Sequence, residues 1–117
     1  MDSVDLEVMR SAVSWVEAGH RATIGTVTRT WGSAPRPVGA KFAVSESGAM
    51  CGSVSGGCVE NDVAVQGLEV IEGGAPRLLT YGITDDQALG VGLPCGGEID
   101  VFIEPLEAED ADEAGAA

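Results

Sequence analysis

The hydrophobic residues of this 117-residue chain change their period along the sequence, and this change limits the folds available to it. Residues 4–18 carry apolar side chains at the spacing of one helical face, and residues 57–71 return to that spacing. Residues 22–31 are rich in Thr, Val and Ile, as in a strand, and residues 98–104 alternate apolar and polar side chains. The order helix, strands, helix, strands predicts an α+β (mixed α/β) fold, with two main helices packed on a small sheet and glycine-rich loops between them.

The same patterns predict which side chains are buried. The two helices are expected to bury one face each, formed by Leu6, Met9, Val13 and Val16 in the first and by Val59, Val63, Leu68, Val70 and Ile71 in the second. Residues 40–45 alternate as a half-buried strand does, and residues 49–54 are expected to return as its hairpin partner. Gly67 lies inside the second helix, where glycine costs about 1 kcal/mol relative to alanine, so we expect close packing there.

Length and charge define the organisation of the chain. We expect one domain over residues 1–105, followed at 106–117 by an acidic, alanine-rich tail without stable structure. The formal net charge of −13 makes nucleic acid and anionic membranes poor partners for the surface as a whole. No stretch approaches the roughly 18 apolar residues of a membrane-spanning helix, and the acidic start is unlike a signal peptide. We therefore expect a cytoplasmic protein.

Two cysteines lie in glycine-rich segments at the ends of predicted elements. Cys58 belongs to the run Gly52–Glu60 (GSVSGGCVE), and Cys95 belongs to Gly92–Gly97 (GLPCGG). Glycines allow the backbone to approach a ligand closely, and the free N–H groups of a helix N-terminus attract an anion or a thiolate. These segments therefore predict a thiol-lined ligand site, although a capped helix with a small core cysteine explains the first run equally well.

The distribution of basic residues suggests a binding site for a small anion. Residues 18–45 contain no Asp or Glu but hold four of the six basic residues, which are Arg21, Arg29, Arg36 and Lys41. Either they form an anion site, to which Ser53 and Ser55 add hydroxyl groups, or they are ordinary solvated side chains. Glu60 falls in the first turn of the second helix, where a carboxylate stabilises the positive terminus more readily than it serves as a general base.

Several other sites are excluded or left open by the spacing. Three cysteines are an odd number, and a cytosolic chain keeps them reduced, so a closed disulfide framework is not expected. The cysteines and the single His20 are too widely spaced for a zinc site. Cys95, between Pro94 and two glycines, could serve metal ligation, sulfur transfer or nucleophilic attack, whereas Cys51 falls in an expected strand.

Taken in order along the chain, these segments resemble the N-terminal domain of the XdhC/CoxI family of xanthine dehydrogenase accessory proteins. The resemblance covers residues 6–105 and rests on 29–36 (RTWGSAPR), 37–39 (PVG), 52–60 (GSVSGGCVE), 81–83 (YGI) and 92–97 (GLPCGG). It implies a maturation factor for molybdenum hydroxylases that binds the molybdenum cofactor (molybdopterin) transiently and helps its sulfuration or its insertion into the apo-enzyme. Such a protein is a chaperone for the cofactor rather than an enzyme.

The resemblance also implies roles for individual residues. Cys58 and Cys95 are expected to ligate or shield the metal, whose dithiolene end is soft. The expected cofactor-binding set comprises both cysteines with Ser53, Ser55, Gly56, Gly57, Arg29, Arg36, Gly96 and Gly97. Members of this family carry a second, Rossmann-like domain, so a separate Rossmann-domain partner or a homodimer is a further expectation. Two alternatives remain: a non-catalytic interaction module, and a thiol-dependent enzyme acting on a small anionic substrate.

Overall fold

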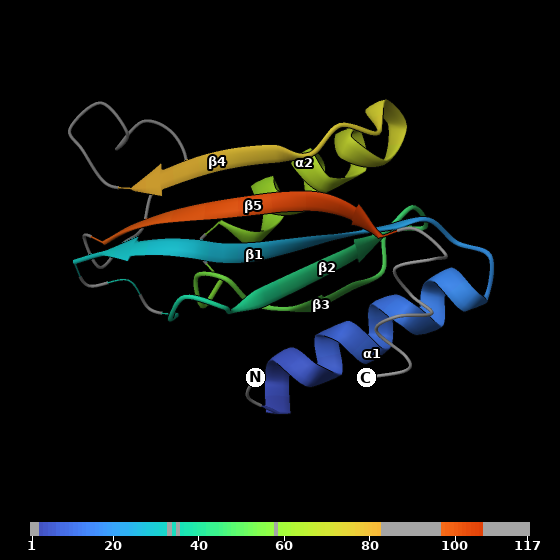
Figure 1. The fold of residues 1–117 in the computed structure, drawn as a ribbon, viewed down its shortest axis with the longest axis horizontal. Helices are drawn as coiled ribbons and strands as arrows, with labels where there is room; N and C mark the ends of the chain where they lie inside the picture. Colours follow the sequence, from blue (N-terminus) through green and yellow to red (C-terminus); the bar gives the residue numbers. More distant parts are fainter. Residues whose placement is uncertain (1–2, 33, 35, 58, 83–96, 107–117) are drawn as a thin grey trace.

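The computed structural model describes residues 3–32, 34, 36–57, 59–82 and 97–106 (Figure 1). Its elements are α1 (Ser3–Glu17), β1 (Ala22–Trp31), β2 (Lys41–Ser45), β3 (Met50–Gly52), α2 (Glu60–Gly73), β4 (Arg77–Gly82) and β5 (Glu98–Leu106). The five strands form one antiparallel sheet in the order β3-β2-β1-β5-β4. The predicted α+β fold with two helices on a small sheet is confirmed, as is the hairpin between β2 and β3.

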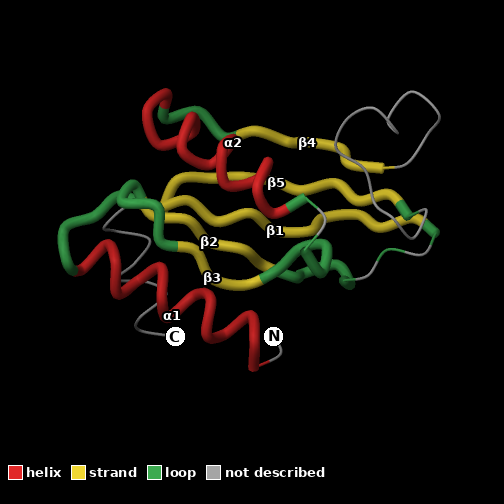
Figure 2. Tube along the Cα trace, turned by 180° about the vertical axis from the view of Figure 1, so that it is seen from behind, coloured by secondary structure: helices red, strands yellow, loops and turns green. Residues whose placement is uncertain are grey.

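The two helices cover opposite faces of the sheet (Figures 1 and 2). Phe42 and Val44 point into the cluster under α2, whereas Ala43 between them packs with Val8 and Ala12 of α1. Strand β2 is therefore buried on both sides, which corrects the prediction of a half-buried strand. Alternation along the strand suggests that one face is exposed to solvent, but a strand between two helices can be apolar on both faces.

The buried face of α1 differs from the predicted one. The helix buries Asp5, Val8 and Ala12, whereas Leu6 is 41% exposed. Met9, which the prediction included, packs partly against this cluster with Trp15. The prediction missed this face because it contains an aspartate, Asp5. The sequence does not show that the Asp5 carboxylate finds hydrogen-bond partners in the folded chain.

In α2 the burial of Val63, Val70 and Ile71 is confirmed, but Leu68 is 37% exposed. The helix instead buries Gly67, the residue before it, together with Ala64. A Cβ atom at Gly67 would lie 2.6 Å from Thr23 Oγ1 and 2.7 Å from Val44 Cγ1. The close packing that the sequence predicted at Gly67 is thus present, and it brings α2 directly onto β1 and β2.

Three expectations fall wholly or partly on residues outside those described. The sequence also predicts a helical turn at residues 85–89, which is one of them. The predicted tail is another, apart from Leu106, which is the last residue of β5. The third is the end of a strand that the sequence predicts over residues 77–83: β4 (Arg77–Gly82) matches it, but Ile83 lies outside the described residues. Neither of the helices in the described part of the chain has the length and hydropathy needed to cross a membrane.

We predict that Gly67→Ala destabilises the protein, although alanine is the better helix former by about 1 kcal/mol. Both atoms that the new methyl group would meet belong to buried, β-branched side chains, so overpacking should cost roughly 1–3 kcal/mol. Gly73→Ala is the matched control, because a Cβ atom there meets nothing within 4 Å. Urea unfolding measures both, and a Gly67→Ala protein as stable as the control would contradict the packing.

Candidate functional site

The loop Ser53–Gly57 joins β3 to the start of α2, and its polar groups converge on Glu60. Oε2 of Glu60 accepts hydrogen bonds from Ser53 Oγ at 3.0 Å and from the N–H groups of Val54 and Ser55, both at 2.8 Å. Oε1 accepts from Ser55 Oγ at 2.5 Å and from Gly57 N–H at 2.9 Å. The predicted anion site at the helix N-terminus therefore holds the carboxylate of the chain itself.

The serine hydroxyls complete this network. Ser53 Oγ accepts from Gly56 N–H at 2.8 Å, and Ser55 Oγ accepts from Val59 N–H at 2.9 Å. Gly56 and Gly57 have φ values of 76° and 114°, a left-handed region that side chains other than glycine rarely adopt. The sequence run of serines and glycines is thus explained by a tight turn that closes around one carboxylate.

Glu60 is held in its charged form by these contacts. Partial burial opposes the charge, but the hydrogen bonds from the Ser55 hydroxyl and from the N–H groups of Ser55 and Val54 outweigh it and lower the pKa of Glu60 to about 2. Glu60 does lie in the first turn of α2, as predicted. Glu60 does more than stabilise the helix N-terminus, because its hydrogen bonds hold the loop that precedes the helix.

Arg36 binds the same loop from the side of α1. Its Nη2 donates to Asp5 Oδ1 at 3.0 Å, and its Nε donates to the carbonyl of Ser53 at 3.3 Å. Asp5 Oδ1 also accepts from Lys41 N–H at 2.9 Å, and Ser53 N–H donates to the Lys41 carbonyl at 2.9 Å. The buried Asp5 thus links the first turn of α1 to the start of the loop.

Arg29 belongs to a different cluster, on β1 and β5. Its Nε donates to Asp100 Oδ2 at 2.8 Å, and Nη2 donates to Asp100 Oδ1 and to Glu98. Hydrogen bonds from Arg29 to the Asp100 and Glu98 carboxylates raise the pKa of Arg29, and the guanidinium in turn lowers the pKa of Asp100. Two carboxylates already neutralise this cation.

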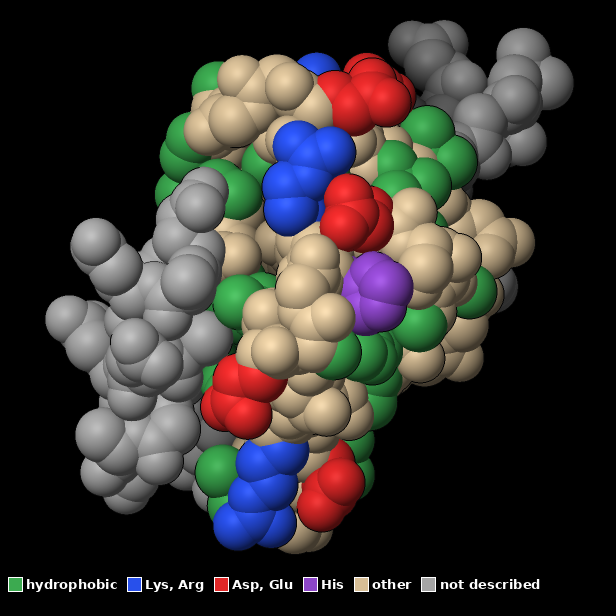
Figure 3. All heavy atoms as spheres, turned by 90° about the vertical axis from the view of Figure 1, so that its right-hand side faces the viewer, with side chains coloured by type: hydrophobic (Ala, Val, Ile, Leu, Met, Phe, Trp, Pro, Cys, Tyr) green, Lys and Arg blue, Asp and Glu red, His purple; other side chains and the backbone are tan. Residues whose placement is uncertain are grey.

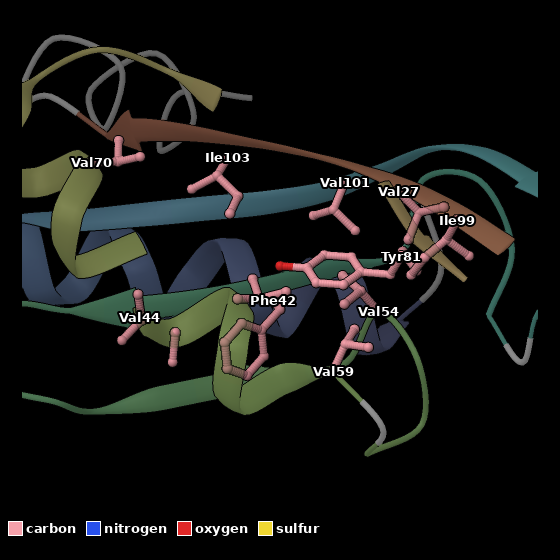
Figure 4. Close-up of a cluster of buried hydrophobic side chains, with 13 residues drawn as sticks. Val27, Phe42, Val44, Val54, Val59, Val70, Tyr81, Ile99, Val101 and Ile103 are labelled. Carbon is pink, nitrogen blue, oxygen red and sulfur yellow. The ribbon is translucent and has the colours of Figure 1, made fainter. Parts of the chain in front are cut away.

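Tyr81 ties the end of β4 to the start of α2. Its hydroxyl donates to Asp62 Oδ2 at 2.6 Å, and burial together with Asp62 raises its pKa. Tyr81 is paired with Ile99 near the start of β5, and both belong to the core cluster that contains Val54 and Val59 (Figure 4). The residues that flank Cys58 and those that flank segment 83–96 are therefore anchored in one part of the core.

His20 lies at the opposite end of the sheet. Ala22 pairs with Ser45 there, and His20 Nδ1 is 4.0 Å from the Glu46 carboxylate, which also binds Arg21. Figure 3 shows the molecule from this end, with the histidine in purple. The loop Ser53–Gly57 follows the end of β3, where Gly52 pairs with Phe42 near the start of β2. The loop is therefore at the end of β2 away from Ser45. His20 therefore lies far from the described loop Ser53–Gly57.

Comparison with known proteins agrees with this architecture. The sequence profile of the XdhC and CoxI family matches residues 15–82, which is more than half of the 117 residues. The chain belongs to the XdhC and CoxI family. The family resemblance inferred from the motifs is therefore confirmed.

Two curated relatives of this XdhC/CoxI-family chain carry functional names. It is 38% identical over 99 residues to the molybdenum cofactor insertion chaperone PaoD of Escherichia coli (strain K12), covering 85% of this chain and 31% of that protein. It is 32% identical over 96 residues to a probable xanthine dehydrogenase subunit of Bacillus subtilis (strain 168), covering 80% and 29%.

A solved structure has the same fold as this XdhC/CoxI-family chain. The crystal structure of a xanthine dehydrogenase from Bacillus halodurans superposes with a TM-score of 0.79 at 26% identity, covering 96% of this chain and 33% of that one. The chain spans about a third of the length of each of these three proteins.

The structure brings together only some of the predicted site residues of this XdhC/CoxI-family chain. Ser53, Ser55, Gly56 and Gly57 share the loop, and Arg36 contacts it; Arg29 lies apart, bound to the carboxylates of β5. Gly97 is buried just before β5. Cys58, Cys95 and Gly96 lie outside the described residues. Within the described residues, no group of three or more His, Cys, Asp or Glu side chains is placed to hold a metal ion.

The sequence predicted no contact around the loop for Asp5, Asp62 or Tyr81, although Tyr81 belongs to the motif 81–83 (YGI). Asp5 and Arg36 are 31 positions apart, and Tyr81 and Asp62 are 19 apart, so no local pattern connects them. A weak signal existed for Asp5, which precedes Val8 and Ala12 at helical spacing on the face that is actually buried.

The depressed pKa of Glu60 predicts an acid-dependent loss of stability. Its folded value of about 2 lies below the ordinary 4.5, so the carboxylate contributes its full stabilisation above about pH 4.5 and loses it as the pH falls toward 2. The difference in unfolding free energy between wild type and Glu60→Gln should therefore be largest above about pH 5 and shrink toward about pH 2–3. Urea unfolding across this range measures it, and a difference independent of pH would contradict the assignment.

Proposed function

We propose that this chain is the cofactor-handling part of a maturation factor for a molybdenum hydroxylase. It binds the molybdenum cofactor transiently and helps its sulfuration or its insertion into the apo-enzyme. The observation that carries the proposal concerns described residues on either side of the two cysteine-bearing segments: Val54 and Val59 near residue 58, and Tyr81 and Ile99 near segment 83–96, share one core cluster. The relative named as a molybdenum cofactor insertion chaperone supports the identity of the ligand.

The chemistry of the donor set fits the metal end of this cofactor. Thiolates are soft ligands, which suit a molybdenum–dithiolene centre, and the proposed ligands are Cys58 and Cys95. At Gly57 a Cβ atom would meet no atom of the described residues within 4 Å, which leaves room for a ligand to approach the backbone there. When bound, the cofactor would supply the hydroxylation chemistry of the target enzyme, whereas this chain would bind, orient and shield it.

The molybdenum cofactor also carries a phosphate group, and a cationic side chain is the expected partner for it. Arg29 and Arg36 are each bound to carboxylates, so we propose that they act by holding the sheet end and the loop in place. Lys41 differs from them, because its Nζ contacts the hydroxyl of Thr26 at 3.1 Å. The backbone carbonyl of Lys41 accepts a hydrogen bond from Ser53 N–H, so Lys41 lies beside the loop. We propose Lys41 as the residue that contacts the phosphate.

A second candidate function is an interaction module without cofactor affinity of its own. It is favoured by one observation, which is that the guanidinium groups of Arg29 and Arg36 are already bound to carboxylates of the chain itself. In that case the chain pairs with a Rossmann-domain polypeptide, with the hydroxylase or with a second copy, and the site is completed between the partners. Binding of the cofactor by the purified chain alone separates the two candidates.

We predict that Cys58→Ala weakens binding of the molybdenum cofactor by at least about tenfold, which corresponds to about 1.4 kcal/mol. Cys95→Ala should have an effect in the same direction, because both thiols are proposed ligands. Cys51→Ala is the control, since Cys51 packs under α1 with Val8 and Ala12. Titration of the purified proteins, followed by fluorescence or calorimetry, measures the affinities. Equal affinity in wild type and Cys58→Ala would remove that thiol from the site.

A further inference from the structure

We propose that Glu60 is a positioning residue for the cofactor site: it holds the Ser53–Gly57 loop in the conformation that presents the segment around residue 58 to the ligand. The inference rests on the proposed function, because it assigns a role within the same site. It goes beyond the family's ligand chemistry, since Glu60 uses both carboxylate oxygens to bind the protein rather than a ligand.

The loop depends on Glu60 for most of the polar contacts described above. Five donors from Ser53, Val54, Ser55 and Gly57 reach its two oxygens at 2.5–3.0 Å. Val54 is fully buried, and its N–H group points at Oε2, so loss of the carboxylate leaves a buried donor facing an apolar core. The loop then has to rearrange, and Gly57 and Val59, the two neighbours of residue 58, move with it.

A second brace limits how the loop can move. Arg36 donates to the Ser53 carbonyl while it is bound to Asp5, so α1 holds the first residue of the loop through two side chains. At Gly52, just before the loop, a Cβ atom would overlap the Lys41 carbonyl oxygen, so the backbone is closely packed there. With its beginning fixed, the loop rearranges at its far end, next to residue 58.

A glutamate could also serve stability alone, and a matched control separates the two roles. Val63 follows Glu60 by three residues on α2, is 1% exposed and packs in the core cluster. Val63→Ala weakens the packing of the helix but leaves every side-chain contact of Glu60 unchanged. If Glu60 acts only on stability, the two variants should impair the site in proportion to their loss of unfolding free energy.

The test compares Glu60→Gln with Val63→Ala in the full chain. Glutamine keeps the shape but replaces one acceptor oxygen by an N–H₂ group that faces donors. We expect Glu60→Gln to weaken cofactor binding at least about tenfold and to change the iodoacetamide alkylation rate of Cys58, followed by peptide mass spectrometry. Val63→Ala should stay within about twofold of wild type in both measurements.

A milder variant keeps the test valid if Glu60→Gln fails to fold. Ser53→Ala removes one of the five donors and should change both measurements in the same direction by a smaller factor, with an unchanged circular dichroism spectrum. Equal effects of Glu60→Gln and Val63→Ala, or no effect of Glu60→Gln, would overturn the inference. If wild type binds no cofactor, the proposed function fails, but the alkylation rates still decide whether Glu60 positions the segment.

Discussion

The carboxylate of Glu60 is the interaction on which the arrangement of the site depends. A helix N-terminus and a glycine-rich turn create a set of N–H donors that favours an anion. In this protein the anion is supplied from inside the chain, at the first residue of α2. The turn is consequently preformed before any ligand arrives, which reduces the entropy that binding has to overcome.

The rest of the fold brings elements to this turn rather than adding donors to it. Gly67 lets α2 lie directly on β1 and β2, and Tyr81 secures the first turn of α2 to the end of β4. On the opposite face, α1 reaches the turn through Asp5 and Arg36. Both helices therefore act on one loop, although they lie on different sides of the sheet.

This arrangement changes how the basic residues are interpreted. Arginines in a chain of net charge −13 suggest a site for a small anion, but Arg29 and Arg36 are paired with carboxylates of the same chain. The contacts of Arg29 join β1 to β5, and those of Arg36 join the loop to α1. The family relationship and the thiol-bearing segments, rather than the overall distribution of charge, support the proposal of a molybdenum cofactor as ligand.

The sequence by itself determined the class of fold, the order of its elements, the hairpin of β2 and β3 and the close contact at Gly67, because these depend on local periodicity and on the size of single residues. It also identified the loop of serines and glycines, through motifs that the family shares. Only the tertiary structure decided which face of α1 is buried and where Arg29, Arg36 and Glu60 find their partners. Charged side chains choose among partners far apart in the sequence, and only the folded sheet sets the distances between them.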